Sequence, residues 1–91
     1  MNYVWDLAMR TNNHCNILRD LVNKYQNTFA FPQGDFGTLC NIVDDYLLVT
    51  ESNMDYRLKQ KFSTLIEQRL VFLKQKILLP ELMVKYPTIF R

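Results

Sequence analysis

Residues Asp55 to Leu79 read DYRLKQKFSTLIEQRLVFLKQKILL, a run without glycine or proline in which most residues favour helix. Apolar residues recur here at steps of three or four, as expected for one face of a helix: Leu58, Phe62, Ile66, Leu70, Leu73 and Ile77. A second set, Leu65, Phe72 and Leu79, repeats every seven residues beside that face. We therefore predict a helix over about residues 54–79, roughly 37 Å long, starting at Asn53 or Asp55.

Two further helices are expected before this one. Residues 2–26 keep a helical apolar phase that includes Leu7, His14 and Leu21, which favours one bent helix. The alternative is a break at Asn12 or Asn13, because asparagine prefers caps and turns to helix interiors. Residues 36–51 repeat the three-four pattern, with Asp35 as the expected N-cap and with Asp44 and Asp45 off the apolar stripe, facing water.

The connections limit how these helices assemble. Pro32 and Gly34 punctuate residues 27–35, where Phe29 and Phe31 are expected to pack on the core. Pro80 ends the long helix and suits the first turn of a short helix over 80–85, followed by a tail of residues 86–91. Amphipathic helices bury their apolar faces only against one another. The sequence therefore predicts a single all-α domain over residues 1–91, a small antiparallel helical bundle of three main helices plus a short C-terminal one.

Composition sets the broad class. Apolar residues make up 48% of the 91 residues and aromatics 13%, as in a packed globular chain. Residues 1–55 carry three basic and seven acidic residues, a net charge of −4, whereas residues 56–91 carry eight and two, a net charge of +6. No basic n-region precedes an apolar run, no 18-residue apolar stretch occurs, and there are two cysteines. We expect a cytoplasmic protein with reduced thiols, no signal peptide and no membrane span.

An enzyme is the weakest class, because few titratable side chains could converge. His14, Cys15 and Cys40 could supply three zinc ligands, but neighbouring residues on a helix point about 100° apart, so no metal site is expected. A Cys40–His14 nucleophile pair across helices would have no third group to orient it. Arg69 lies in phase with the apolar face, and we expect its guanidinium to reach solvent or pair with a carboxylate. No cofactor is expected, since no glycine-rich phosphate loop is present.

Nucleic-acid binding is the alternative function. Basic side chains decorate the long helix and would contact phosphates or another anionic partner: Arg57, Lys61, Arg69, Lys74 and Lys76. They spread around the helix, however, and the 27–35 connection is too long for a helix-turn-helix.

A protein-interaction or regulatory module, homodimeric and without enzymatic activity, is the leading hypothesis. Apolar residues surround the helix from Arg69 to Leu79, so a partner subunit or the folded-back segment 86–90 would have to cover one side. The expected partner and dimer interface contains Val71, Phe72, Leu78, Leu79 and Trp5. Such a module would dock on a larger protein or occlude a site on it. Its size and its residue usage would suit a phage or mobile-element product. That class includes inhibitors, although no residue in the sequence points specifically to inhibition.

Overall fold

All regular secondary structure in the computed structural model is helical across the residues that it describes, which are 3–26, 31–53, 55–77 and 79–90, with side chains from Asp6 onward. Three long helices come first in the chain, and two short ones follow: α1 Tyr3–Tyr25, α2 Gln33–Glu51, α3 Tyr56–Lys76, α4 Pro80–Lys85 and α5 Pro87–Phe90. The expected all-α class with three main helices is confirmed. α1 is one helix without a break at Asn12 or Asn13.

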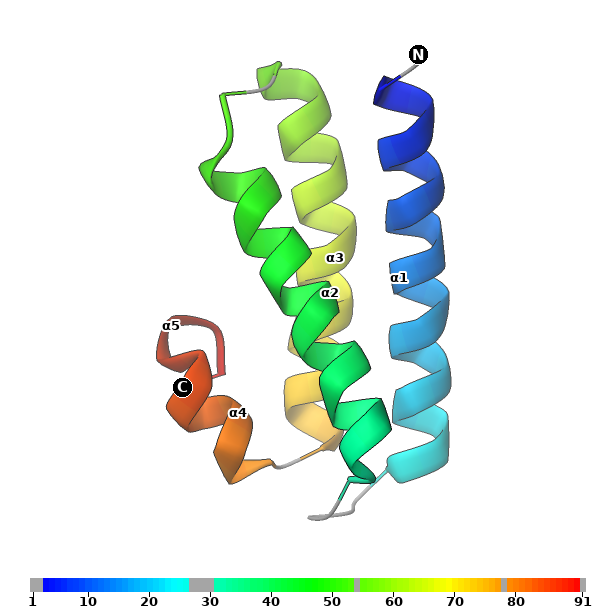
Figure 1. Cartoon of the computed structure of the whole chain (residues 1–91), viewed down its shortest axis with the longest axis vertical. Helices are drawn as coiled ribbons and strands as arrows, with labels where there is room; N and C mark the ends of the chain where they lie inside the picture. The colour runs from blue at the N-terminus through cyan, green and yellow to red at the C-terminus, as the bar shows by residue number, and fades with distance from the viewer. Residues whose placement is uncertain (1–2, 27–30, 54, 78, 91) are drawn as a thin grey trace.

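The three long helices lie side by side, and α2 runs in the direction opposite to the other two (Figure 1). Helices that follow one another in the chain are therefore antiparallel, as the sequence predicts, but α1 and α3 are parallel neighbours. α1 packs more extensively on α3 than on α2. The long dimension of the molecule is 39 Å, set by these helices.

Apolar stripes from all three long helices meet in one core. The most completely buried large side chains lie in this core and come from α1, α2, α3 and the short helix α4: Leu18, Leu39, Ile42, Val43, Leu70, Leu73 and Leu82. Phe31, in the connection before α2, packs on this core and lies with its ring centroid 4.4 Å from that of Tyr25. The predicted core packing is confirmed for Phe31, and Phe29 lies outside the described residues.

The start of α2 differs from the sequence prediction. The helix begins at Gln33, with Pro32 at the N-cap position, so that Asp35 lies within the first turn and is not the N-cap. The Asp35 carboxylate accepts a hydrogen bond from the Tyr25 hydroxyl, 2.5 Å away. An acidic residue in the first turn also complements the positive end of the helix dipole, so Asp35 stabilises this end without capping it.

The long helix α3 begins as expected but ends earlier. Asp55 is its N-cap and accepts hydrogen bonds from the backbone amides of Arg57 and Leu58, at 3.0 and 3.3 Å. The helix ends at Lys76, because Ile77 and Leu79 have extended backbones. Proline disfavours the helical conformation in the residue before it, which explains why Leu79, next to Pro80, has left the helix. The predicted end at residue 79 is therefore wrong.

The C-terminal segment folds back on α2. The Tyr86 hydroxyl donates to the Asp44 carboxylate at 2.6 Å and lies 3.3 Å from the Cys40 carbonyl oxygen, while Phe90 is buried in the core. The segment expected to be a simple tail thus contains the helical turn α5, seen beside α2 in Figure 1. It leaves Val71, on α3, exposed over 49% of its surface.

Candidate functional site

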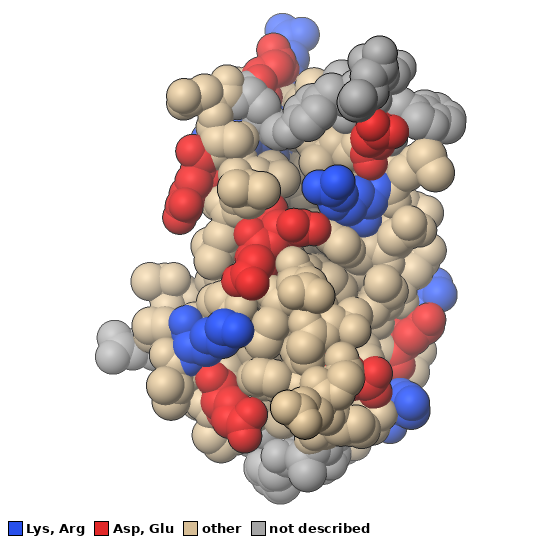
Figure 2. Space-filling view, viewed as in Figure 1, with Lys and Arg blue, Asp and Glu red and all other residues tan. Residues whose placement is uncertain are grey.

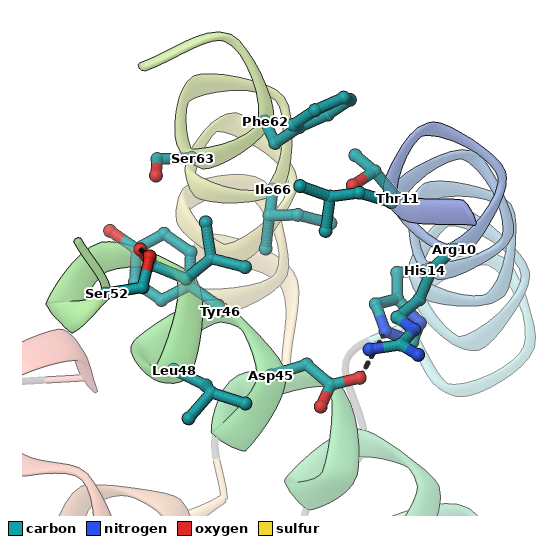
Figure 3. Close-up of a pocket in the computed structure, with 12 residues that line it drawn as sticks. Arg10, Thr11, His14, Asp45, Tyr46, Leu48, Ser52, Phe62, Ser63 and Ile66 are labelled. Atoms are coloured by element: carbon teal, nitrogen blue, oxygen red, sulfur yellow. Dashed lines mark hydrogen bonds and ion pairs between the residues drawn. The ribbon is translucent and has the colours of Figure 1, made fainter. Parts of the chain in front are cut away.

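A small cavity lies between the three long helices, near the amino-terminal halves of α1 and α3 (Figure 3). Its volume is about 50 Å³. Polar side chains from each helix border it, among them Thr11 and His14 from α1, Asp45 from α2 and Ser63 from α3. A space of this size accommodates one or two water molecules.

A histidine–aspartate pair closes one side of the cavity. His14 Nε2 lies 2.9 Å from Asp45 Oδ2, and the two side chains are 17% and 36% exposed. The prediction that Asp45 faces water holds only in part, since 36% of its side chain is exposed but its carboxylate turns toward His14 on α1. Asp44 is exposed as expected, although it also accepts the hydrogen bond from Tyr86. The pair links α1 to α2 across 31 residues of sequence.

The polar groups around this cavity do not assemble into a nucleophilic triad. His14 Nδ1 and Ser63 Oγ are both buried without a hydrogen-bond partner. In Figure 3 they stand on opposite sides of Ile66, so the serine is not placed to lose its proton to the histidine. Burial raises the pKa of the nearby Tyr46 hydroxyl above 10.0, and the negative charge of Glu67 adds to this effect.

The candidate zinc ligands do not converge. Cys40 is buried in the core, whereas Cys15 is half-buried on α1, with its sulfur 3.9 Å from the Leu65 carbonyl oxygen. His14 pairs with Asp45. Within the described part of the chain, no three histidine, cysteine, aspartate or glutamate side chains are grouped so that they could hold a metal ion.

A larger depression runs between α1 and α3, and we call it the α1–α3 groove. Its volume is about 360 Å³, and its described lining comes from these two helices alone: Ala8, Thr11, Asn12, Cys15, Asn16, Lys61, Phe62, Leu65, Gln68 and Arg69. Leu65 is 42% exposed here. Arg69 is exposed, so its guanidinium reaches solvent and is not enclosed in a polar pocket.

The five basic residues singled out on the long helix do not share one surface. At 100° per residue, Lys61, Arg69 and Lys76 fall within about 80° of one another, with Arg57 one turn before Lys61. Lys74 points about 140° away from the nearest of the three. Figure 2 shows acidic and basic side chains interspersed over the face in that view, with uncharged residues between them.

The predicted interface residues have different environments. Val71 and Phe72 are exposed over 49% and 45% of their surfaces, but Leu79 is only 5% exposed because it packs in the core of its own chain. Leu78 and the side chain of Trp5 lie outside the described residues. Val71 borders a shallow depression with Thr64 and Glu67, whereas Phe72 is on the side of Leu65 and the α1–α3 groove.

Sequence reasoning missed the groove itself. The seven-residue repeat of Leu65 and Phe72 is visible in the sequence, but the sequence does not show that α1 would stand beside α3 and leave Leu65 partly uncovered. No helix in the described part of the chain is long and apolar enough to cross a membrane. Comparison of the chain with protein-family models, curated proteins and solved structures finds no match.

Proposed function

We propose that this protein is a non-enzymatic interaction module that docks on a larger protein through the row formed by Leu65 and Phe72 on α3. The observation that carries the proposal is the exposure of these two large apolar side chains, at 42% and 45%. The C-terminal segment, which is the chain's own candidate to cover α3, packs on α2 instead. No described segment of the chain covers the row, so it is open to a partner from outside the chain.

The expected energetic gain is adequate for docking. Full burial of a leucine or phenylalanine side chain is worth about 1.5–3 kcal/mol, and aromatic residues commonly anchor interfaces. The ammonium of Lys76 lies 5.8 Å from the ring centroid of Phe72, which places a positive charge beside the apolar row. In a two-fold homodimer, which the sequence also suggests, the same row would meet its own copy.

An interaction role also agrees with the chemistry of the three-helix cavity. The His14–Asp45 pair holds two helices together, and the unpaired hydroxyl of Ser63 is on the other side of Ile66. Arg69, the basic residue in phase with the apolar face of the long helix, is exposed and not enclosed in a polar pocket. These observations favour binding over catalysis.

Site-specific photo-crosslinking tests the proposal. A photoreactive phenylalanine analogue replaces Phe72 in one sample and the exposed Gln60, on another side of α3, in a matched control. In extracts of the source cells, position 72 should give an adduct with one defined protein that position 60 does not give. The purified partner should then bind the unmodified chain, and Leu65→Glu with Phe72→Glu should weaken binding at least about tenfold.

Two results would count against docking on a larger protein. Equal adducts from both positions would mean that the row has no special role, as would unchanged affinity after the double substitution. An adduct of two copies of this chain would assign the row to a homodimer instead.

Nucleic-acid binding is the second candidate, favoured by the shared orientation of Lys61, Arg69 and Lys76. It predicts that a mixed-sequence DNA duplex binds the chain and that its affinity falls steeply between about 50 and 200 mM salt. Fluorescence anisotropy of a labelled duplex measures this directly. Binding that is absent at the lower salt concentration removes this candidate.

A further inference from the structure

We propose that the α1–α3 groove receives an acidic amphipathic helix of the partner protein. This inference rests on the proposed function and specifies the partner's chemistry. A helix laid along a groove between two parallel helices buries its apolar face while its flanking side chains meet the groove edges. The groove supplies both elements, because apolar side chains line it and its α3 side carries two cations.

The charge of the groove is uniformly positive. Lys61 and Arg69 line it, and no aspartate or glutamate is among its described lining residues. Neither of the two cations forms an ion pair with another described residue of the chain. Because no described residue pairs with them, both cations are available to carboxylates of a partner.

Neighbouring residues extend this positive edge. Arg19 stands one helical turn beyond Cys15 on α1, and Lys76 stands seven residues beyond Arg69 on α3, so both fall on the groove side of their helices. Arg19 lies 3.5 Å from Asp20, but both side chains are more than half exposed, which makes this pair weak. Glu67 points about 160° away from Leu65 around α3, so this carboxylate is on the other side of the helix.

Apolar side chains also line the groove. Leu65 is exposed over 42% of its surface, and Ala8 and the half-buried Cys15 lie opposite it on α1. The amides of Asn12, Asn16 and Gln68 complete the lining, and they can both donate and accept hydrogen bonds. Phosphates of a nucleic acid would leave Leu65 without an apolar contact, and two lining cations are few compared with the phosphate contacts of typical DNA-binding surfaces.

The spacing of the cations predicts a motif in the partner. Lys61 and Arg69 are eight residues apart, about 12 Å along the helix axis. A partner helix that pairs with both needs acidic residues seven or eight positions apart. An apolar residue three or four positions from the first of them would face Leu65.

Selection from a random peptide library tests this inference while the partner is still unidentified. The full chain is immobilised and presented with displayed peptides of about 15 residues, long enough to form four helical turns. The enriched peptides should carry a net negative charge, with paired acidic residues at the predicted spacing and an apolar residue between them. The best peptide is then synthesised, and its affinity is measured by fluorescence anisotropy.

Matched variants locate the binding site. Lys61→Glu with Arg69→Glu should weaken peptide binding at least about tenfold, because two attractive charge pairs become repulsive. Lys24→Glu with Lys85→Glu makes the same change in net charge at two exposed lysines outside the described lining of the groove. This control should change affinity by less than about twofold. Circular dichroism of each variant checks that all remain folded.

The inference is overturned if no peptide is enriched, if the enriched peptides have no acidic excess, or if the groove variant binds them as well as the control does. A DNA duplex that binds through Lys61 and Arg69 while peptides do not would assign the groove to nucleic acid. Light scattering that shows a dimer abolished by the groove variant would assign it to a second copy of the chain. If the enriched peptides lack acidic residues while the Phe72 crosslink to a partner persists, the partner's chemistry is wrong and the proposed function stands.

Discussion

Tyr86 donates its hydroxyl proton to the carboxylate of Asp44 at 2.6 Å, across 42 residues of sequence. The same hydroxyl lies 3.3 Å from the backbone carbonyl oxygen of Cys40, so it contacts α2 at two successive turns. Because Tyr86 is only 6% exposed, this contact fixes where the C-terminal segment packs. The segment held in this way covers α2 and leaves the apolar row of α3 open.

Substitution of Tyr86 should weaken the packing of this segment on α2. Tyr86→Phe retains the ring but leaves the Asp44 carboxylate without its donor, so we expect the free energy of unfolding to fall by about 1–2 kcal/mol. Urea denaturation followed by circular dichroism measures the change. The control is Tyr56→Phe, at a side chain that is 74% exposed, and it should have an effect below about 0.5 kcal/mol. Equal losses in the two variants would show that the hydroxyl of Tyr86 contributes nothing.

Alkaline pH should destabilise the fold through the same side chain. Burial, aided by the hydrogen bond to Asp44, raises the pKa of the Tyr86 hydroxyl above the ordinary value of 10.0. Above pH 10 the unfolded chain therefore loses a proton that the folded chain keeps, and ionisation favours unfolding. The stability is fully present below this pH and declines as pH rises further.

Urea unfolding at about pH 8 and about pH 11 measures this decline. Tyr86→Phe should lose less stability than the parent chain between these two pH values. Part of the decline should remain in the variant, because burial also raises the pKa of Tyr46. An identical decline in the two chains would mean that Tyr86 ionises alike in the folded and unfolded states.

The N-cap of α3 offers a local test. Asp55→Ala removes the acceptor for the amides of Arg57 and Leu58 and should cost about 1 kcal/mol of stability. Asp55→Asn keeps an acceptor oxygen and should retain most of that stability. The melting temperatures of the three chains rank the contributions, and a loss as large in Asp55→Asn as in Asp55→Ala would argue that charge, and not capping, matters at this position.

A double-mutant cycle measures the link between α1 and α2. His14→Ala, Asp45→Ala and the double variant should give a coupling free energy of about 0.5–1 kcal/mol, because the pair is partly shielded from water. The exposed pair Arg19–Asp20, 3.5 Å apart, should give a coupling close to zero in the same assay. Equal couplings would show that partial burial does not strengthen the His14–Asp45 contact.

The local features of the fold follow from the sequence where a short-range cause exists. The apolar periodicity predicts the three long helices, the cap residues Asn53 and Asp55 predict the start of α3 to within two residues, and Pro80 predicts the start of α4. Periodicity does not predict a helix start that lacks a side-chain cap, and so it places the N-cap at Asp35, which instead binds Tyr25. To predict where a helix begins or ends, one also needs to know which residues the terminal side chains contact in the fold.

The candidate site is less accessible to sequence reasoning. Leu65 and Phe72 can be recognised as a row, but apolar residues carry no directional signal that tells which other element covers them. The hydroxyl of Tyr86 is directional, yet its acceptor Asp44 is distant in the sequence and resembles any exposed aspartate. Leu79 illustrates the same limit, since it is as apolar as Phe72 but is buried by its own chain.

The parallel pairing of α1 with α3 has a consequence for biosynthesis. α1 leaves the ribosome before α2 and α3 and has its principal packing partner in α3, so the largest helix–helix contact is complete only after residue 76 has emerged. Until then α1 can pack only on α2, and much of its apolar surface remains exposed to solvent. We expect a nascent chain stopped after residue 55 to remain sensitive to protease and one extended through α4 to become resistant, with folding completed late and in a single step.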